Sequence, residues 1–209
     1  MVKIKICGIT ELDDALHAID CGADALGFVF YERSPRAITR NRAQAIIAAL
    51  PPFVTVVGLF VNEDPRTVRE IADDCGLDVI QYHGDESPET LRLAPRRSIR
   101  ALRVRENVTF DEIARYPASG LLLDAWVTGA FGGTGVLCNW EIAAWIAKKR
   151  PVILAGGLTP ENVATAIRTV RPYGVDVSSG VEDAPGRKDR KKVAAFIKAA
   201  QIAASVAKD

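Results

Sequence analysis

The sequence has few features that would tie it to a membrane or to a nucleic acid. No apolar run reaches the roughly 18 residues that a bilayer-spanning helix needs. The first residues also lack the cationic and apolar segments of a signal peptide. A formal net charge of +1 gives no excess of basic residues for binding a phosphate backbone. We therefore expect a cytoplasmic protein with no membrane partner and no nucleic-acid partner.

Cysteine and histidine are also scarce. The four cysteines are scattered and form no C-x-x-C pair; they are Cys7, Cys21, Cys75 and Cys138. Neither histidine, His17 or His83, stands in metal-ligand spacing with a cysteine. We therefore expect reduced thiols rather than a disulfide framework, and no metal site.

Short apolar runs alternate with longer amphipathic segments along the chain. Eight strands are expected, at Lys3–Cys7, Ala25–Phe28, Thr55–Phe60, Val79–Gln81, Ile99–Val104, Leu121–Asp124, Val152–Ala155 and Val175–Val177. Eight helices are expected, at Glu11–Asp20, Arg42–Leu50, Pro65–Cys75, Pro88–Leu93, Phe110–Tyr116, Trp140–Lys148, Pro160–Val170 and Lys191–Val206. Strict alternation implies a parallel sheet, because parallel strands need crossover connections.

Eight strand-helix units in 209 residues match the lower size limit of a closed barrel. The expected fold is therefore α/β, a single (β/α)8 TIM barrel of eight parallel strands that occupies residues 1–209 as one domain. A doubly wound open sheet is the alternative. It would usually carry a G-x-G-x-x-G turn after its first strand, and that motif is absent here.

Capping residues mark the starts of four expected helices. Thr10 precedes the first helix. Asp64, Ser87 and Thr159 each precede a proline, which suits the first helical position because no N–H is needed there.

The carboxyl ends of barrel strands form the active face. Residues that could bind or react with a ligand stand at the ends of the expected strands or in the loops after them. They are Cys7, Arg33, Arg36, His83, Asp124, Gly156, Gly157, Asp176, Ser178, Ser179 and Gly180. Each has an ordinary explanation when taken alone, such as packing for a thiol, solvation for Arg33 or a turn for a glycine.

Taken together, these residues indicate a site. Asp124 follows three leucines, and a buried carboxylate is costly unless it is paired or used. Small residues follow strands seven and eight, where barrels often bind phosphate through backbone N–H groups. A thiol, a carboxylate and an arginine beside them predict proton transfer on a phosphorylated substrate with a second anionic group. The basic stretch at residues 186–192, by contrast, is interpreted mainly as the solvated start of a helix, with a smaller chance of helping to attract phosphate.

Several segments together resemble the phosphoribosylanthranilate isomerase family of tryptophan biosynthesis. They are KICGIT, GFVFYERSPR, LDVIQYHGDE, LLLDA, GGTG, LAGGLTPENV and GVDVSSGVEDAPGRKD, in order from residue 3 to about residue 190. The resemblance implies an isomerase that needs no metal and no cofactor. Its substrate is N-(5-phosphoribosyl)anthranilate, and its product, by Amadori rearrangement, is 1-(2-carboxyphenylamino)-1-deoxyribulose 5-phosphate.

The resemblance also implies roles for individual residues. Asp124 would be the general acid that opens the furanose ring, and Cys7, as thiolate, the general base that removes the C2′ proton. Arg36 would hold the anthranilate carboxylate, His83 would line the anthranilate side, and Asp176 would lie near the reacting sugar. The phosphate cradle would consist of Gly156, Gly157, Ser178, Ser179 and Gly180. The expected partner is a small phosphorylated molecule, and the expected assembly is a monomer or a homodimer.

The chain departs from the family pattern in two places. Cys138-Asn139-Trp140 stands where an aromatic-Asp-Trp triplet is expected, and Asn caps a helix about as well as Asp. Tyr82 replaces a leucine before His83, which we expect to alter packing beside the substrate. The glycine-rich residues 128–135 are a candidate lid.

Three rival functions stay open from the sequence. One is the sister isomerase of histidine biosynthesis or another phosphosugar isomerase, although the sister enzyme's pattern has an aspartate where Cys7 stands. Another is a phosphate-binding barrel without catalysis. The third is a thiol redox protein, against which the isolation of Cys7 argues.

Overall fold

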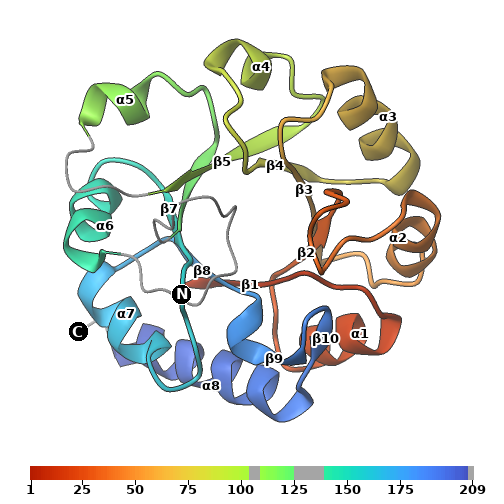
Figure 1. The fold of residues 1–209 in the computed structure, drawn as a ribbon. Coiled ribbons are helices and arrows are strands. Elements are labelled where there is room, and N and C mark those ends of the chain that lie inside the picture. The colour runs from red at the N-terminus through yellow and green to blue at the C-terminus, as the bar shows by residue number, and fades with distance from the viewer. Residues whose placement is uncertain (104–108, 125–138, 207–209) are drawn as a thin grey trace.

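The computed structural model describes residues 1–103, 109–124 and 139–206. Eight parallel strands form a closed barrel in chain order, and the last strand pairs with the first (Figure 1). The strands are β1 Lys3–Cys7, β2 Ala25–Val29, β3 Thr55–Phe60, β4 Val79–Tyr82, β5 Arg97–Arg103, β6 Gly120–Asp124, β7 Val152–Leu154 and β8 Gly174–Val177. The barrel prediction is confirmed and the open-sheet alternative is excluded; the expected final strand residue Val104 lies outside the described residues.

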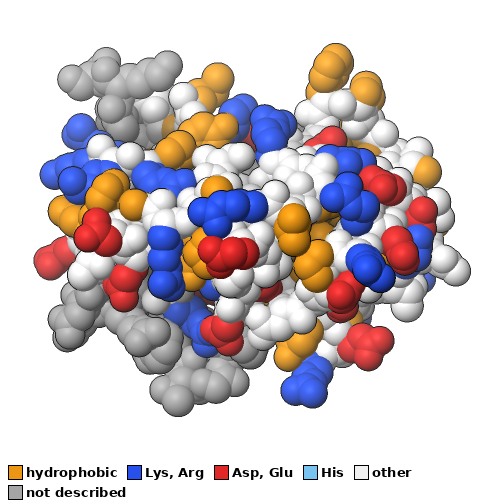
Figure 2. All heavy atoms as spheres, turned by 90° about the horizontal axis from the view of Figure 1, so that it is seen from above, with side chains coloured by type: hydrophobic (Ala, Val, Ile, Leu, Met, Phe, Trp, Pro, Cys, Tyr) orange, Lys and Arg blue, Asp and Glu red, His pale blue; other side chains and the backbone are white. Residues whose placement is uncertain are grey.

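A ring of helices surrounds the strands (Figure 1). These helices are α1 Leu12–Asp20, α2 Arg40–Ile47, α3 Pro65–Cys75, α4 Pro88–Arg92, α5 Phe110–Ala114, α6 Trp140–Ala147, α7 Val163–Val170 and α8 Arg190–Val206. None of the helices in the described ranges is long and apolar enough to cross a membrane. Basic and acidic side chains are interspersed over the face in Figure 2, which agrees with the small net charge.

Two predicted helix starts are wrong. Thr10 does not cap α1; its hydroxyl donates to the backbone carbonyl of Gly186, and Glu11 takes the capping position without a side-chain bond. Thr159 opens a turn instead, and α7 begins only after Asn162. Local capping patterns failed at these two positions because tertiary contacts engaged the threonine in one case and a turn intervened in the other.

The other caps follow the expected chemistry. Asp64 accepts from the backbone N–H groups of Arg66 and Thr67, and Ser87 accepts from that of Thr90. Asn139 accepts from the first N–H groups of α6, as expected for an asparagine in place of aspartate.

After β8 the chain forms three short elements that were not predicted. They are the 3-10 helix η1 Ser179–Val181 and the antiparallel strands β9 Glu182–Ala184 and β10 Arg187–Lys188. The basic stretch at residues 186–192 therefore does not belong wholly to a solvated helix start. Its Lys188 is buried, which corrects that interpretation.

Alternation along each strand decides which side chains face the barrel interior. On β1, Ile4 and Ile6 pack outward in the main apolar core, whereas Cys7 packs inward with residues of β2 and β3. Tyr82 of β4 likewise belongs to the outer core, between barrel and helices. The expectation that Tyr82 packs beside the substrate is therefore wrong.

Candidate active site

A cavity of about 460 Å³ lies at the carboxyl ends of the strands. Its lining includes every residue that the sequence predicted for the site, namely Cys7, Arg36, His83, Asp124, Gly156, Gly157, Asp176, Ser178, Ser179 and Gly180. Arg33 also lines the cavity but is exposed, as expected for a solvated loop arginine. Eight parallel strands aligned in one barrel bring these distant segments to the same end.

Cys7 occupies the last position of β1 and is 5% exposed. Burial raises the pKa of its thiol above the ordinary value, because a desolvated thiolate is disfavoured. The positive charge of Lys5 lowers the pKa and so opposes this shift, while the negative charge of Asp176 adds to it. Lys5 Nζ itself lies 2.9 Å from Asp176 Oδ1, in a pair that is almost wholly buried.

Arg36 reaches the cavity from the loop after β2, and its guanidinium is already bound on one side. Its Nε lies 2.9 Å from Glu182 Oε1 and its Nη2 lies 2.7 Å from Glu182 Oε2. Lys188 Nζ donates to the same carboxylate at 2.7 Å. Burial raises the pKa of Glu182, but the two cations outweigh burial and the pKa is lowered overall. Glu182 is therefore an anion that orients Arg36.

His83 and Asp124 meet across the cavity from β4 and β6. His83 Nε2 lies 3.4 Å from Asp124 Oδ2, and both side chains are buried. Gln81 Nε2 lies 3.0 Å from His83 Nδ1. Because the amide donates to Nδ1, a neutral His83 carries its proton on Nε2. Nε2 is buried and has no hydrogen-bond partner among the described residues, so its approach to Asp124 is close but lacks hydrogen-bond geometry.

The loops after β7 and β8 are shaped by glycines. Gly156 and Gly157 have φ values of 78° and 64°, which suit glycine. A Cβ on Gly180 would come 1.9 Å from the backbone oxygen of Leu158, so no larger residue fits there. Ser178 Oγ is buried with no hydrogen-bond partner among the described residues. Such a group favours a polar ligand, because a buried unpaired hydroxyl is costly.

A family model described as N-(5'phosphoribosyl)anthranilate (PRA) isomerase matches residues 4–199. The chain belongs to this family. An N-(5′-phosphoribosyl)anthranilate isomerase from Pelobacter propionicus is 55% identical over 201 residues, which are 96% of both chains. A crystal structure of the isomerase from Thermotoga maritima shares 42% identity and a TM-score of 0.90, covering 96% of this chain and 99% of that one.

Two other solved members of the isomerase family bear on ligand and assembly. One holds reduced 1-(o-carboxyphenylamino)-1-deoxyribulose 5-phosphate; it is 41% identical, with a TM-score of 0.87, and the match covers 96% of this chain and 99% of that one. The other is described as monomers generated from the dimeric Thermotoga maritima enzyme; it is 38% identical, with a TM-score of 0.82, and the coverage is the same.

Four polar residues at the site of this family member were missed from the sequence: Lys5, Gln81, Glu182 and Lys188. Lys5 and Gln81 alternate with buried apolar residues on β1 and β4, and that pattern was a usable signal. Glu182 and Lys188 gave no such signal, because they act through a hairpin that local patterning does not reveal. Cys138 and the candidate lid at 128–135 lie outside the described residues.

Proposed function

We propose that this chain catalyses the isomerisation of N-(5′-phosphoribosyl)anthranilate in tryptophan biosynthesis, with Cys7 as general base and Asp124 as general acid. Family membership supports the reaction. The observation that supports the residue roles is that Cys7 and Asp124 line one cavity. The same cavity is lined by Arg36 from the loop after β2 and by the glycines of the loops after β7 and β8. A thiol and a carboxyl group there can serve the two proton transfers that the reaction needs.

In the first step, the Asp124 carboxyl group donates its proton to the furanose ring oxygen. The bond between C1′ and that oxygen breaks, and the anilino nitrogen lone pair forms the Schiff base. Three leucines precede Asp124 on β6, and its buried side chain lines the cavity, which supports its contact with the substrate. His83 Nε2 can then donate to the carboxylate that remains.

In the second step, the Cys7 thiolate takes the proton from C2′. The electron pair of the broken C–H bond forms the double bond between C1′ and C2′, and the Schiff base nitrogen becomes an amine. The resulting enolamine tautomerises to the ketone product. Cys7 faces the cavity at the end of β1, which supports its contact with the sugar.

Two anion sites would hold the substrate between these groups. Arg36 keeps its Nη1–Nη2 edge for the anthranilate carboxylate, because Glu182 occupies its Nε–Nη2 edge. The loops at Gly156–Gly157 and Ser178–Gly180 would bind the phosphate through backbone N–H groups and Ser178 Oγ. Asp176, paired with Lys5, would lie beside the sugar. A cytoplasmic location and a monomeric or homodimeric assembly belong to the same proposal; a dimeric relative supports the latter.

The decay of phosphoribosylanthranilate fluorescence tests the proposal. Purified protein, Cys7→Ala, Asp124→Ala and the matched control Cys75→Ala are compared. Cys75 is a buried thiol on α3, away from the cavity. We expect rapid turnover in the unmodified protein and in Cys75→Ala. Cys7→Ala and Asp124→Ala should each lose about 10²-fold or more in kcat, the usual loss of a general acid or base. Turnover that survives Cys7→Ala would show that Cys7 is not the general base and that its thiol serves packing alone.

A further inference from the structure

We propose that Lys5 stabilises the Cys7 thiolate and thereby sets the fraction of enzyme that holds an active base. The inference rests on the proposed role of Cys7. Lys5 itself does not line the cavity but lies beneath it, inside the barrel. It is therefore a positioning residue that acts through the sulfur.

The backbone places Lys5 and Cys7 side by side. They stand two residues apart on β1, so both side chains point into the barrel. Gly27 pairs with Cys7 in the neighbouring strand β2. A Cβ on Gly27 would lie 2.7 Å from Cys7 Sγ and 3.1 Å from Lys5 Cε. The sulfur and the lysine chain thus share the space that this glycine leaves open.

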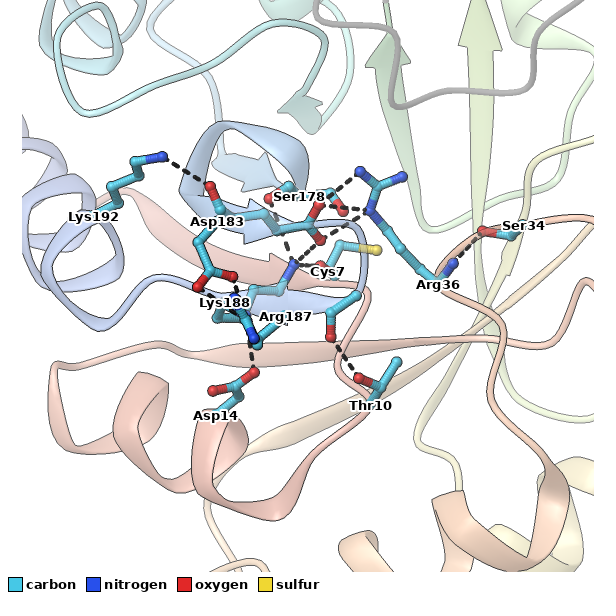
Figure 3. Close-up of polar contacts among 12 residues, drawn as sticks. Cys7, Thr10, Asp14, Ser34, Arg36, Ser178, Asp183, Arg187, Lys188 and Lys192 are labelled. Atoms are coloured by element: carbon cyan, nitrogen blue, oxygen red, sulfur yellow. Dashed lines mark hydrogen bonds and ion pairs between the residues drawn. The ribbon is translucent and has the colours of Figure 1, made fainter.

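The number of N–H donors that are already engaged favours Lys5 over Lys188 as the partner of the Cys7 sulfur. The three N–H groups of Lys188 have three acceptors: the carbonyls of Cys7 and Ser178, and the Glu182 carboxylate. Figure 3 shows the Cys7 sulfur pointing away from the Lys188 ammonium. Within the described part of the chain, Lys5 donates one N–H to Asp176, which leaves two N–H groups that can face the sulfur.

Charge in the buried cluster points the same way. On the Cys7 side of the cavity lie three cations, Lys5, Lys188 and Arg36, and two carboxylates, Asp176 and Glu182. The nearby Asp14 carboxylate is also buried and accepts from the Lys188 backbone N–H, and of these charges Lys5 acts most strongly on the Cys7 sulfur. His83 and Asp124 face the cavity from the other side.

The Lys5 charge is present at neutral pH. Burial lowers the pKa of Lys5, but the charges of Asp176 and Cys7 outweigh burial and raise it overall. Burial also raises the pKa of Cys7, and Lys5 is the strongest influence that lowers it. Removing the ammonium should therefore leave the thiolate less populated.

The experiment measures the rate of Cys7 alkylation by iodoacetamide against pH, read at the peptide level by mass spectrometry. The alkylation rate follows the thiolate fraction. Lys5→Gln removes the charge and keeps a donor for Asp176. Lys3→Gln is the matched control, because Lys3 is exposed on the same strand and pairs with Asp24. Alkylation of Cys21 in the same samples serves as an internal reference.

In Lys5→Gln we expect the Cys7 midpoint to rise by about one pH unit or more, a tenfold or larger loss of thiolate near neutral pH. The pH profile of kcat/KM should rise at correspondingly higher pH. Asp176→Asn should move the Cys7 midpoint downward, and this opposite shift serves as a second test should Lys5→Gln fold poorly. Lys3→Gln and Cys21 should show no shift.

An unchanged Cys7 midpoint in Lys5→Gln would overturn the inference, even where activity falls. In Asp176→Asn, an upward shift or no shift would also contradict it. A shifted midpoint with an unchanged kcat/KM profile would support the Lys5–Cys7 interaction and remove Cys7 from the role of base. The two proposals can therefore fail separately.

Discussion

Lys188 Nζ donates a 2.6 Å hydrogen bond to the backbone carbonyl of Cys7, and so fastens the β9–β10 hairpin to the end of β1. The same ammonium also reaches the Ser178 carbonyl and the Glu182 carboxylate. One buried cation thus contacts the proposed base Cys7, the proposed phosphate-binding residue Ser178 and the carboxylate that orients Arg36. Figure 3 shows the Lys188 ammonium directed toward Cys7 and Ser178.

Lys188→Met should destabilise the protein strongly. The substitution removes one of the two cations of the buried Glu182 carboxylate and the donor to the Cys7 and Ser178 carbonyls, and breaking a buried ion pair usually costs about 3–5 kcal/mol. Urea unfolding at pH 7 measures the change. Lys192→Met is the control, because Lys192 is exposed and contacts the Glu182 backbone carbonyl; its cost should stay within about 1 kcal/mol. Equal losses of unfolding free energy in the two variants would show that the buried Lys188 contacts stabilise the protein no more than an exposed lysine does.

Glu182→Gln should show a pH-dependent loss of stability. The cations Arg36 and Lys188 hold the pKa of Glu182 below its ordinary value of 4.5, against the effect of burial. The stabilisation is therefore fully present above pH 4.5 and is lost as the pH falls through the lower value of the folded state. Urea unfolding of both proteins should show a large difference at pH 7 and a smaller one near pH 3.5. A difference that does not change with pH would show that the Glu182 charge does not stabilise the fold.

The periodic alternation of the sequence predicted the barrel, because each strand and helix buries one face whose spacing is visible in the chain. The end of a strand is equally visible, so Cys7 and Asp124 could be placed on the active face from sequence alone. The parallel barrel then brings them to one cavity by its topology.

The hairpin of Glu182 and Lys188 was not visible in this way. Its three-residue and two-residue strands carry no periodic signal, and the value of its charges depends on partners more than 140 positions away, such as Arg36. Lys188 stands among basic residues that do reach solvent, so composition favoured the wrong interpretation. Burial of a single charged residue in a basic run is a tertiary property.

Arg36→Lys should weaken substrate binding more than it slows the chemical steps. A lysine cannot hold Glu182 and a substrate carboxylate on two edges at once, as a guanidinium can. We expect KM to rise about 10- to 100-fold, in line with the loss of a charged hydrogen bond. Steady-state kinetics separate KM from kcat. Arg33→Lys, at the exposed rim of the same loop, should change KM little. A similar rise in both variants would show that the effect is not specific to Arg36.

Gln81→Leu should change the tautomer of His83. The Gln81 amide donates to His83 Nδ1, and this bond keeps the imidazole proton on Nε2, 3.4 Å from Asp124 Oδ2. Without the donor, the neutral ring can carry its proton on either nitrogen, and fewer molecules present a donor to the proposed acid. We expect kcat to fall about tenfold, equivalent to about 1.4 kcal/mol.

Nitrogen-15 NMR tests the Gln81 prediction directly, because the chain has only two histidines and their signals can be assigned by substituting His17. His83 in the unmodified protein should show an acceptor Nδ1 and a protonated Nε2, and in Gln81→Leu the two nitrogen shifts should move toward each other. Tyr82→Phe is the control, since Tyr82 is the next residue on β4 but packs outward among the helices. Unchanged His83 shifts in Gln81→Leu would mean that Asp124, rather than Gln81, fixes the tautomer.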